Sequence, residues 1–216
     1  MIVTLLGSTG LVGKEVLHFL EASPFVEKII LPVRKIPEGP IGAKSYPVEI
    51  DFENLKLHKN CFLADSVICC LGTTLKKAGS QKAREHVDLQ IPLASAAIAK
   101  VQNVKHFLVI SAQGANAHSP FHYNRTKGLL EDGLKMLGFP SLTIIRPSLL
   151  LGKRAEARNL EDLFQKITEK HLHLIPEFWR PVHAKAVAAE LIASLQSPPN
   201  GTHIIFNRAI ARHDSF

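Results

Sequence analysis

Cysteine is scarce in this sequence of 216 residues: there are three, and two of them, Cys69 and Cys70, are adjacent. Such a set does not form a disulfide framework, so the sequence fits a reducing compartment. The 11 histidines are scattered, without the spacing to cysteine that zinc sites require. A chain of this length buries roughly two thirds of its unfolded surface and needs neither kind of cross-link. These absences exclude a disulfide-rich secreted domain and a zinc-stabilised one.

Long apolar runs and long basic runs are lacking as well. Apolar stretches such as residues 91–99 fall far short of the roughly 20 residues that cross a bilayer, so no membrane span is expected. The formal net charge is +7, but adjacent basic residues occur only in pairs, with acidic residues between them. No stripe of lysine and arginine alternates with aromatic residues. We therefore interpret the charge as surface solvation and expect no nucleic-acid binding.

What the sequence does contain is an alternation of β-type and helix-type segments. The segments expected to form strands are residues 1–6, 28–34, 43–50, 66–71, 106–111, 141–146 and 202–206. Those expected to form helices are residues 11–20, 82–101, 121–138 and 182–197. Pro92 predicts a kink or break in the second helix. The alternation predicts an α/β fold, with a doubly wound, Rossmann-like parallel sheet covered on both faces.

The domain organisation follows from the same pattern. No repeat or low-complexity linker interrupts the sequence, so residues 1–216 are expected to form one domain, with the more charged residues 153–182 as a small cap near its C-terminal end. The first predicted strand starts at once and leaves no room for a signal or transit peptide. We therefore expect a cytoplasmic protein.

Three glycines, Gly7, Gly10 and Gly13, follow the first predicted strand and open the first helix. Backbone N–H groups at a helix N-terminus can receive a pyrophosphate if no side chain blocks the approach. Glycine supplies the turn, the open approach and the close packing of helix on strand. The alternative is a tight turn with a helix-packing glycine. In this strand–helix context we favour dinucleotide binding. The predicted cofactor loop is Gly7-Ser8-Thr9-Gly10-Leu11-Val12-Gly13.

The same segment nearly matches a second phosphate-binding motif, the P-loop. That motif requires glycine where Ser8 stands, and a magnesium-binding hydroxyl where Glu15 stands. A carboxylate at the second position would also face the phosphates. The P-loop is therefore excluded.

The end of the second predicted strand indicates which dinucleotide binds. Proteins that prefer NAD(H) usually place an acidic residue there to bind the ribose 2′-hydroxyl. This sequence has Arg34 and Lys35, and a guanidinium pairs well with a 2′-phosphate. We favour NADP(H) over NAD(H), with two solvated surface cations as the alternative.

Tyr123 and Lys127 lie four residues apart and share one face of a predicted helix. A tyrosine ionises only near pH 10 in water, and a nearby ammonium together with an oxidised nicotinamide favours its phenolate. Making a tyrosine act near pH 7 takes about 4 kcal/mol, more than an exposed pair supplies, so such a site must be partly desolvated. The alternative is an ordinary contact on the helix surface.

With these motifs in order, the sequence resembles an atypical short-chain dehydrogenase/reductase of the Tat-interacting oxidoreductase-like group and its small bacterial relatives. The resemblance covers nearly the whole chain, including residues 69–74 and 146–148. It implies that Tyr123 donates a proton and that Lys127 binds the nicotinamide ribose. The remaining cofactor contacts that it implies are Asp51 at the adenine, Leu71 and Gly72 at the adenosine ribose, and Pro147 and Ser148 at the nicotinamide carboxamide.

The resemblance departs from the family pattern after the fifth strand. The family often carries a Ser-Ser pair there, whose second serine polarises the substrate carbonyl, but this sequence reads Ser111-Ala112. Ser111 takes that catalytic role if the backbone re-aims it, and otherwise caps the strand. The residues offered as lining of a substrate site are Phe121, His122, Trp179 and His183, and Cys69 and Cys70 are interpreted as packing residues.

Two functions remain open from the sequence. The first is an NADP(H)-dependent oxidoreductase that moves hydride between nicotinamide and a small carbonyl or alcohol substrate. The second is a non-catalytic NADP(H)-sensing regulatory protein, whose affinity for a protein partner depends on the cofactor. Ala112 and the small cap motivate the second.

Overall fold

The computed structural model describes residues 1–151, 176 and 178–214. Within these residues, seven strands form one sheet in the order β3-β2-β1-β4-β5-β6-β9, and every neighbouring pair is parallel. The strands are β1 (Ile2–Leu6), β2 (Lys28–Val33), β3 (Ser45–Glu49), β4 (Ser66–Cys69), β5 (His106–Ile110), β6 (Ser141–Arg146) and β9 (Gly201–Phe206). The predicted α/β fold with a doubly wound parallel sheet is confirmed.

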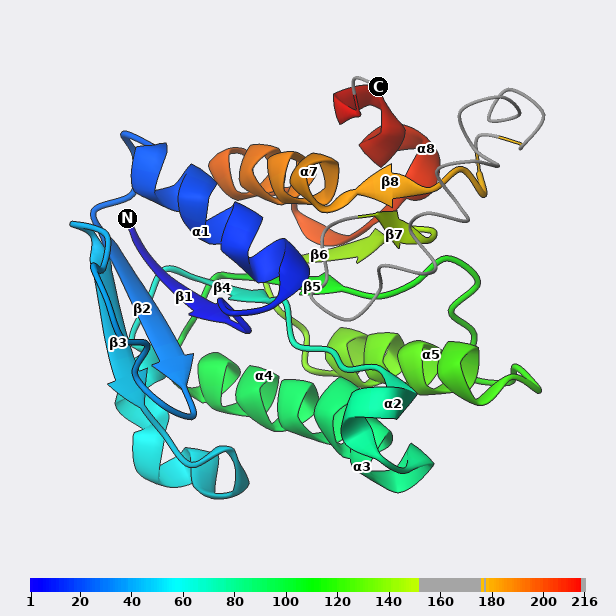
Figure 1. Cartoon of the computed structure of the whole chain (residues 1–216), viewed down its shortest axis with the longest axis horizontal. Coiled ribbons are helices and arrows are strands. Elements are labelled where there is room, and N and C mark those ends of the chain that lie inside the picture. The colour runs from blue at the N-terminus through cyan, green and yellow to red at the C-terminus, as the bar shows by residue number, and fades with distance from the viewer. Residues whose placement is uncertain (152–175, 177, 215–216) are drawn as a thin grey trace.

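Helices cover both faces of the sheet (Figure 1). The principal ones are α1 (Leu11–Ala22) and α7 (Ala184–Gln196) on one face, and α4 (Ile91–Val101) and α5 (His122–Met136) on the other. The shorter helices are η1 (Phe52–Phe62), α2 (Leu75–Ala78), α3 (Gln81–Glu85), η2 (His86–Gln90), α8 (Asn207–Ile210) and η4 (Ala211–His213).

The central strands are mostly apolar because both of their faces are buried. In β5, Leu108 and Ile110 pack in the core beneath α1 and α7. Phe107 and Val109 alternate with them and pack in the second core, beneath α4 and α5. This period of two on a fully buried strand explains why the sequence shows a continuous apolar run rather than an alternating one.

The interruption expected at Pro92 takes the form of a change of helix type. The π-helical turn η2 precedes α4, and Pro92 lies in the first turn of α4. Proline has no backbone N–H, and in the first turn of a helix that N–H would have no partner within the helix. The helix η1 was not foreseen, because its 3₁₀ geometry and mixed polarity give no 3.6-residue pattern.

The expected cap, residues 153–182, lies almost wholly outside the described residues. Next to it, β7 (Leu150–Leu151) pairs in parallel with β8 (Val182–His183). Within the described part of the chain, no helix has the length and apolar character needed to cross a membrane.

The strand order creates the position of the site. From β1 the chain proceeds outward to β2 and β3, then crosses to β4 on the other side of β1 and continues outward through β5 and β6. In open parallel sheets, ligands bind beyond the carboxyl ends of the strands at such a switch point. The loops after β1, β2, β4, β5 and β6 are therefore the ones to inspect.

Candidate cofactor and catalytic site

The glycine loop makes a turn that only glycine permits. Gly7 has φ of +79°, and a Cβ there would lie 2.8 Å from the carbonyl carbon of Cys70. A Cβ on Gly13 would lie 2.0 Å from the Gly7 carbonyl oxygen. The tight turn and the close approach of helix to strand are therefore both real, and they bring the start of α1 to the carboxyl end of β1.

The amino end of α1 is open toward an anion. Its N-cap is Gly10, which has no side chain that could bind the first N–H groups of the helix. The first turn holds no acidic residue. The first N–H groups of a helix have no partner within the helix, and the helix dipole adds partial positive charge. Together these features suit the pyrophosphate of a dinucleotide.

Arg34 follows β2 directly and lines a hollow of about 590 Å³ after β2 and β3. The hollow also contains Asp51, Glu49, Glu53 and His58. The predicted adenosine-side residues Arg34 and Asp51 therefore do come together. Lys35 is exposed instead, and its Nζ lies 3.8 Å from Glu38 Oε1. An ion pair this exposed contributes little.

Asp51 is held in place by local hydrogen bonds. Its Oδ1 accepts from the Glu53 backbone N–H at 2.9 Å and its Oδ2 from Asn54 Nδ2 at 2.7 Å. These bonds lower the pKa of the Asp51 carboxyl, that from Asn54 most strongly. The carboxylate is thus ionised, oriented and exposed.

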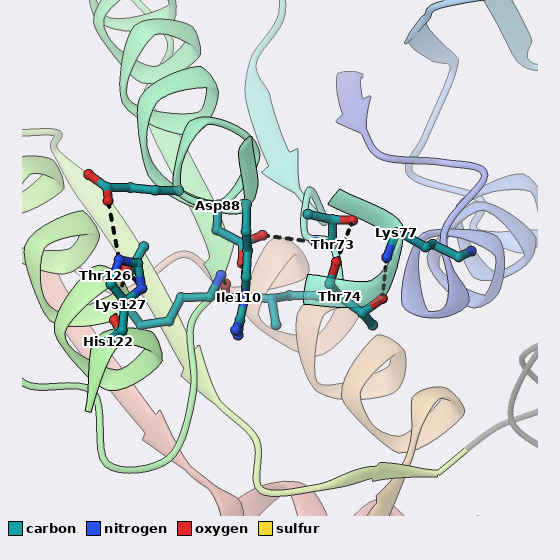
Figure 2. Close-up of polar contacts among 10 residues, drawn as sticks. Thr73, Thr74, Lys77, Asp88, Ile110, His122, Thr126 and Lys127 are labelled. Carbon is teal, nitrogen blue, oxygen red and sulfur yellow. Dashed lines mark hydrogen bonds and ion pairs between the residues drawn. The ribbon is translucent and has the colours of Figure 1, made fainter. Parts of the chain in front are cut away.

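The loop after β4 carries Leu71 and Gly72 and is anchored by Asp88. Asp88 is buried, and its Oδ1 accepts a hydrogen bond from the Thr73 backbone N–H at 2.8 Å. This contact ties the π-turn η2 to the loop (Figure 2). It fixes the backbone at Gly72, where a contact with a ribose is expected.

Lys127 and Tyr123 project from the first turns of α5 at the carboxyl edge of the sheet. Lys127 is only 4% exposed. Its Nζ donates to the Ile110 carbonyl oxygen at 3.2 Å (Figure 2). Within the described residues it forms no ion pair, so the buried ammonium keeps donors for a ligand. A tyrosine that acts near neutral pH needs a partly desolvated site. Lys127 is desolvated in this way, whereas Tyr123 is 37% exposed.

A second cation lies against Tyr123. The Arg84 guanidinium carbon is 4.4 Å from the centroid of the tyrosine ring, and Arg84 Nε lies 3.4 Å from Asp88 Oδ2. Asp88 therefore connects the Gly72 loop to the arginine that covers the phenol ring. Such stacking adds positive charge beside the tyrosine.

Ser111 points away from any catalytic position. Its Oγ donates to Glu131 Oε1 at 2.5 Å in the interior. Glu131 also binds Arg146 through two hydrogen bonds, of 2.8 and 2.5 Å, and this contact raises the pKa of Arg146. The backbone thus does not re-aim Ser111. A catalytic Ser111 stays a prediction, one that this geometry does not favour.

Pro147 and Ser148 lie beside the loop after β5, and their contact with the nicotinamide stays a prediction. The Pro147 carbonyl accepts from the Gln113 N–H at 2.8 Å. The Ser148 N–H donates to Asn207 Oδ1 at 2.9 Å, and its hydroxyl donates to the Arg180 carbonyl. The Ser148 side chain is thus held by the backbone of Arg180.

The residues offered as substrate lining have varied surroundings. Phe121 is exposed at the start of α5, and His122 Nε2 lies 3.5 Å from Glu85 Oε2. Trp179 meets Phe178 edge-on at 5.4 Å, and His183 Nδ1 lies 2.8 Å from Asp214 Oδ1. Their lining role stays a prediction.

The adjacent cysteines behave as packing residues. Burial raises the pKa of the Cys69 thiol to about 11 and that of Cys70 well above its usual range. Both thiols are therefore protonated and unreactive at neutral pH.

Four residues of this region were not found from the sequence: Arg84, Asp88, Gln113 and Glu131. No local pattern of polar and apolar residues marks them. Some of their contacts join residues that are far apart in the sequence, such as Arg84 and Tyr123. The one available signal was Asp88, an acidic residue that stands between the apolar residues Val87 and Leu89.

The fold and the residues at its carboxyl edge define a dinucleotide-binding fold of the short-chain dehydrogenase/reductase type. Known structures with this fold include the enzyme WbmH of Bordetella bronchiseptica in complex with NAD+, with a TM-score of 0.71, 15% identity, and coverage of 95% of this chain and 75% of that one. The UDP-glucose 4-epimerase of Thermotoga maritima with UDP-glucose gives a TM-score of 0.70 and 14% identity, with coverage of 95% and 77%. No protein-family model matches the chain.

Sequence relatives identify the family. The protein HTATIP2 of Rattus norvegicus is 33% identical over 215 residues, which are 96% of this chain and 87% of that protein. The mitochondrial protein FMP52 of Candida albicans is 35% identical over 160 residues, 72% of this chain and 70% of that protein. The chain belongs to this family of atypical short-chain dehydrogenases/reductases, as the resemblance predicted.

The expected cytoplasmic location was wrong. The FMP52 relatives from Candida albicans, Scheffersomyces stipitis and Emericella nidulans are named mitochondrial, and this finding overturns the expectation. The physical reason is that location is set by receptors that read targeting signals. The position of the first strand therefore does not determine it.

Proposed function

We propose that this protein binds a nicotinamide dinucleotide across the switch point and acts as an oxidoreductase on a small carbonyl or alcohol. The observation that carries the proposal is Lys127: a buried ammonium, hydrogen-bonded to one carbonyl, one helical turn from Tyr123 and near the end of β5. A buried charge without an ionic partner is costly and is best explained by a ligand that uses it.

The residues present fit the cofactor. Gly7 and Gly13 leave a cradle that a Cβ would fill, and the uncapped start of α1 presents N–H donors to the pyrophosphate. Asp51, Leu71 and Gly72 line the adenosine side, and Pro147 and Ser148 the nicotinamide side. The complex of WbmH with NAD+, a neighbour of the same fold, supports this assignment. When bound, the nicotinamide supplies or accepts the hydride.

Arg34 is the residue that favours the phosphorylated cofactor, NADP(H). Its guanidinium stands at the end of β2 on the hollow that Asp51 shares. A 2′-phosphate there gains a charge-assisted pair with Arg34. We therefore propose NADP(H) rather than NAD(H).

In the reaction, Tyr123 donates a proton to the substrate oxygen during reduction and accepts it during oxidation. Lys127 binds the ribose hydroxyls and adds positive charge near the phenol, and Arg84 adds a second cation against its ring. The proton leaves the Tyr123 hydroxyl as the oxygen of the carbonyl becomes an alcohol.

The test measures NADPH oxidation with a panel of aldehydes and ketones, and cofactor affinity by calorimetry. Wild type should turn over at least one substrate, Tyr123→Phe should lose turnover while it keeps NADPH affinity, and Lys127→Ala should lose both. If the wild-type rate does not exceed that of Lys127→Ala for any substrate, the oxidoreductase proposal fails.

A second candidate function is NADP(H) sensing without turnover. Two observations favour it: Ala112 carries no hydroxyl, and the hydroxyl of Ser111 is bound to Glu131. It predicts that saturating NADPH changes the affinity of the chain for a protein partner, as thermodynamic linkage requires. Pull-downs that recover the same partners in the same amounts with and without NADPH count against it.

A further inference from the structure

A cation from a neighbouring helix lies against the ring of Tyr123. The guanidinium carbon of Arg84 is 4.4 Å from the ring centroid, and Arg84 belongs to α3 whereas Tyr123 belongs to α5. At this distance the negative face of an aromatic ring attracts a cation. Because arginine does not lose its proton in proteins, the contact places a permanent positive charge on the ring of the proposed proton donor.

The position of Arg84 is fixed by one buried carboxylate. Asp88 is 1% exposed, and its Oδ2 lies 3.4 Å from Arg84 Nε. Its Oδ1 accepts a hydrogen bond from the Thr73 backbone N–H at 2.8 Å (Figure 2). The carboxylate therefore cannot turn away from the arginine without breaking its bond to the loop after β4. The Arg84 side chain is only 20% exposed, so water weakens this pair less than it weakens an ion pair on the open surface.

An irregular helical turn carries the carboxylate. The π-turn η2 follows α3 directly and continues directly into α4. Hydrogen bonds in such a turn span five residues rather than four, and these turns are frequent at functional sites. In this chain the irregular turn contains Asp88, the residue that joins Thr73 to Arg84.

Other charged groups near Tyr123 come from its own helix and from α3. Lys127 stands one turn further along α5. His122 precedes Tyr123, and its Nε2 lies 3.5 Å from Oε2 of Glu85 on α3. Within the described part of the chain, Arg84 is the one cation in contact with the Tyr123 ring.

The contact is stronger for the ionised phenol than for the neutral one. When the Tyr123 hydroxyl releases its proton, the negative charge spreads from the oxygen into the ring that the guanidinium covers. An opposite charge at this range favours the charged form of an acid. Arg84 therefore makes the proton easier to donate during reduction, and it stabilises the phenolate that accepts a proton during oxidation.

We propose that Arg84 is a positioning residue for Tyr123, held over the phenol ring by Asp88, and that it sets the pH range in which the tyrosine exchanges its proton. Arg84 transfers no proton and acts through the ring. Its part in turnover rests on the proposed function, whereas its effect on the phenol can be measured without a substrate.

The first experiment titrates the phenol directly. The chain has two tyrosines, Tyr46 and Tyr123, so in a Tyr46→Phe background the ultraviolet absorption of tyrosinate reports Tyr123 alone. Arg84→Met in this background should raise the titration midpoint by about 0.5 to 1.5 pH units, as expected for loss of a partly desolvated cation–π contact. Arg84→Lys keeps the charge and should give an intermediate midpoint. Circular dichroism at each pH value confirms that the chain stays folded.

Lys82→Met is the matched control for this titration. Lys82 is an exposed cation on α3, the helix that also carries Arg84. Its removal changes the net charge by the same amount as Arg84→Met but leaves the tyrosine ring covered. The midpoint should therefore stay within about 0.2 pH units, because solvent and salt screen the Lys82 charge. An equal rise in both variants would refute a specific role of Arg84.

The same change should appear in turnover. The substrates are 4-nitrobenzyl alcohol and the alcohol of the best carbonyl in the panel, each with NADP+. In Arg84→Met, the pH at which kcat reaches half of its plateau should rise by the amount found in the titration. Below that pH kcat should fall about 3- to 30-fold, while the plateau stays within about twofold of wild type. A purely structural role of Arg84 predicts a lower Tm and an unchanged pH profile instead.

Asp88→Asn tests how the arginine is held. An asparagine oxygen still accepts the Thr73 N–H, but the charge that pairs with Arg84 is removed. If Asp88 holds Arg84 over the ring, the titration midpoint of Tyr123 should rise, because the guanidinium is released. If Asp88 is only a nearby negative charge, its removal should lower the midpoint. A lower or unchanged midpoint therefore refutes the holding role of Asp88.

The outcomes separate this inference from the proposed function. If Arg84→Met titrates within about 0.2 pH units of its background, the inference is refuted whether or not any substrate turns over. If the titration changes but the pH profile of kcat does not, the role of Arg84 in turnover is refuted and the oxidoreductase proposal stands. If wild type turns over no substrate, the oxidoreductase proposal fails together with the role of Arg84 in turnover, and the titration alone decides its effect on the phenol.

Discussion

Lys127 Nζ donates to the carbonyl oxygen of Ile110 at 3.2 Å, and this contact joins helix α5 to the end of the central strand β5. The ammonium is buried without an ion-pair partner among the described residues. It is therefore placed for binding a ligand at some expense of stability, because a buried charge costs desolvation energy.

Lys127→Met should separate these two effects. The substitution keeps the apolar stem and removes the buried charge, so we expect a Tm equal to or a few degrees above that of wild type. NADPH affinity should fall at least tenfold, because the ribose contact is lost. Thermal unfolding and calorimetry on the same samples measure both. A variant that unfolds more easily by several kcal/mol would show that Lys127 is structural.

Gly13→Ala tests the cradle. Its Cβ would lie 2.0 Å from the Gly7 carbonyl oxygen, so α1 must move away from β1 at a cost of about 3 kcal/mol. NADPH affinity should be lost in whatever fraction folds. Gly72→Ala is the matched control for stability, because its nearest contact is 3.6 Å, to Asp88 Oδ1. Equal chemical denaturation midpoints for the two variants would contradict the packing argument.

Arg34→Ala tests the choice of cofactor. Loss of a charge-assisted contact to a phosphate should weaken NADPH binding about 10- to 100-fold, whereas NADH binding should change less than threefold. Lys35→Ala should have a smaller effect, because the Lys35 side chain is 83% exposed and paired only weakly with Glu38. If Arg34→Ala weakens both cofactors equally, Arg34 does not read the 2′-phosphate.

Ser111 and Glu131 should affect stability rather than the chemical step. Glu131→Gln leaves Arg146 without its carboxylate, and we expect a loss of about 3–5 kcal/mol. Ser111→Ala removes one hydrogen bond and should cost about 1 kcal/mol with kcat unchanged within twofold. Urea denaturation and steady-state kinetics measure these changes. A large loss of kcat in Ser111→Ala at normal stability would restore its predicted catalytic role.

His106 should make the fold less stable in mild acid. Burial lowers the pKa of its imidazole from 6.5 to about 4, so the folded state resists a proton that the unfolded chain accepts. The free energy of unfolding is therefore unaffected by this histidine above pH 6.5. It falls by as much as about 3 kcal/mol as the pH falls toward 4. His106→Met should flatten the unfolding free energy across this interval. If wild type and variant show the same pH slope, His106 is not the cause.

The glycine loop, the buried strands and the Tyr123/Lys127 pair could be predicted because each depends on neighbours in the sequence. Turn geometry needs glycine at given positions, a buried strand needs consecutive apolar residues, and residues four apart share a helix face. The order of these elements along the chain then limits the possible topologies to a few.

The direction of single side chains was decided by the tertiary structure. Ser111 meets Glu131, 20 positions later. Arg84 covers Tyr123, which comes from a different helix, and Asp88 reaches back to Thr73. These contacts depend on how α3, η2 and α5 pack beside the sheet, which no local pattern encodes. The sequence by itself therefore determined the strands of the sheet, the principal helices and the glycine loop between the first of each. The packing of those elements decided which polar groups remain free to meet a substrate.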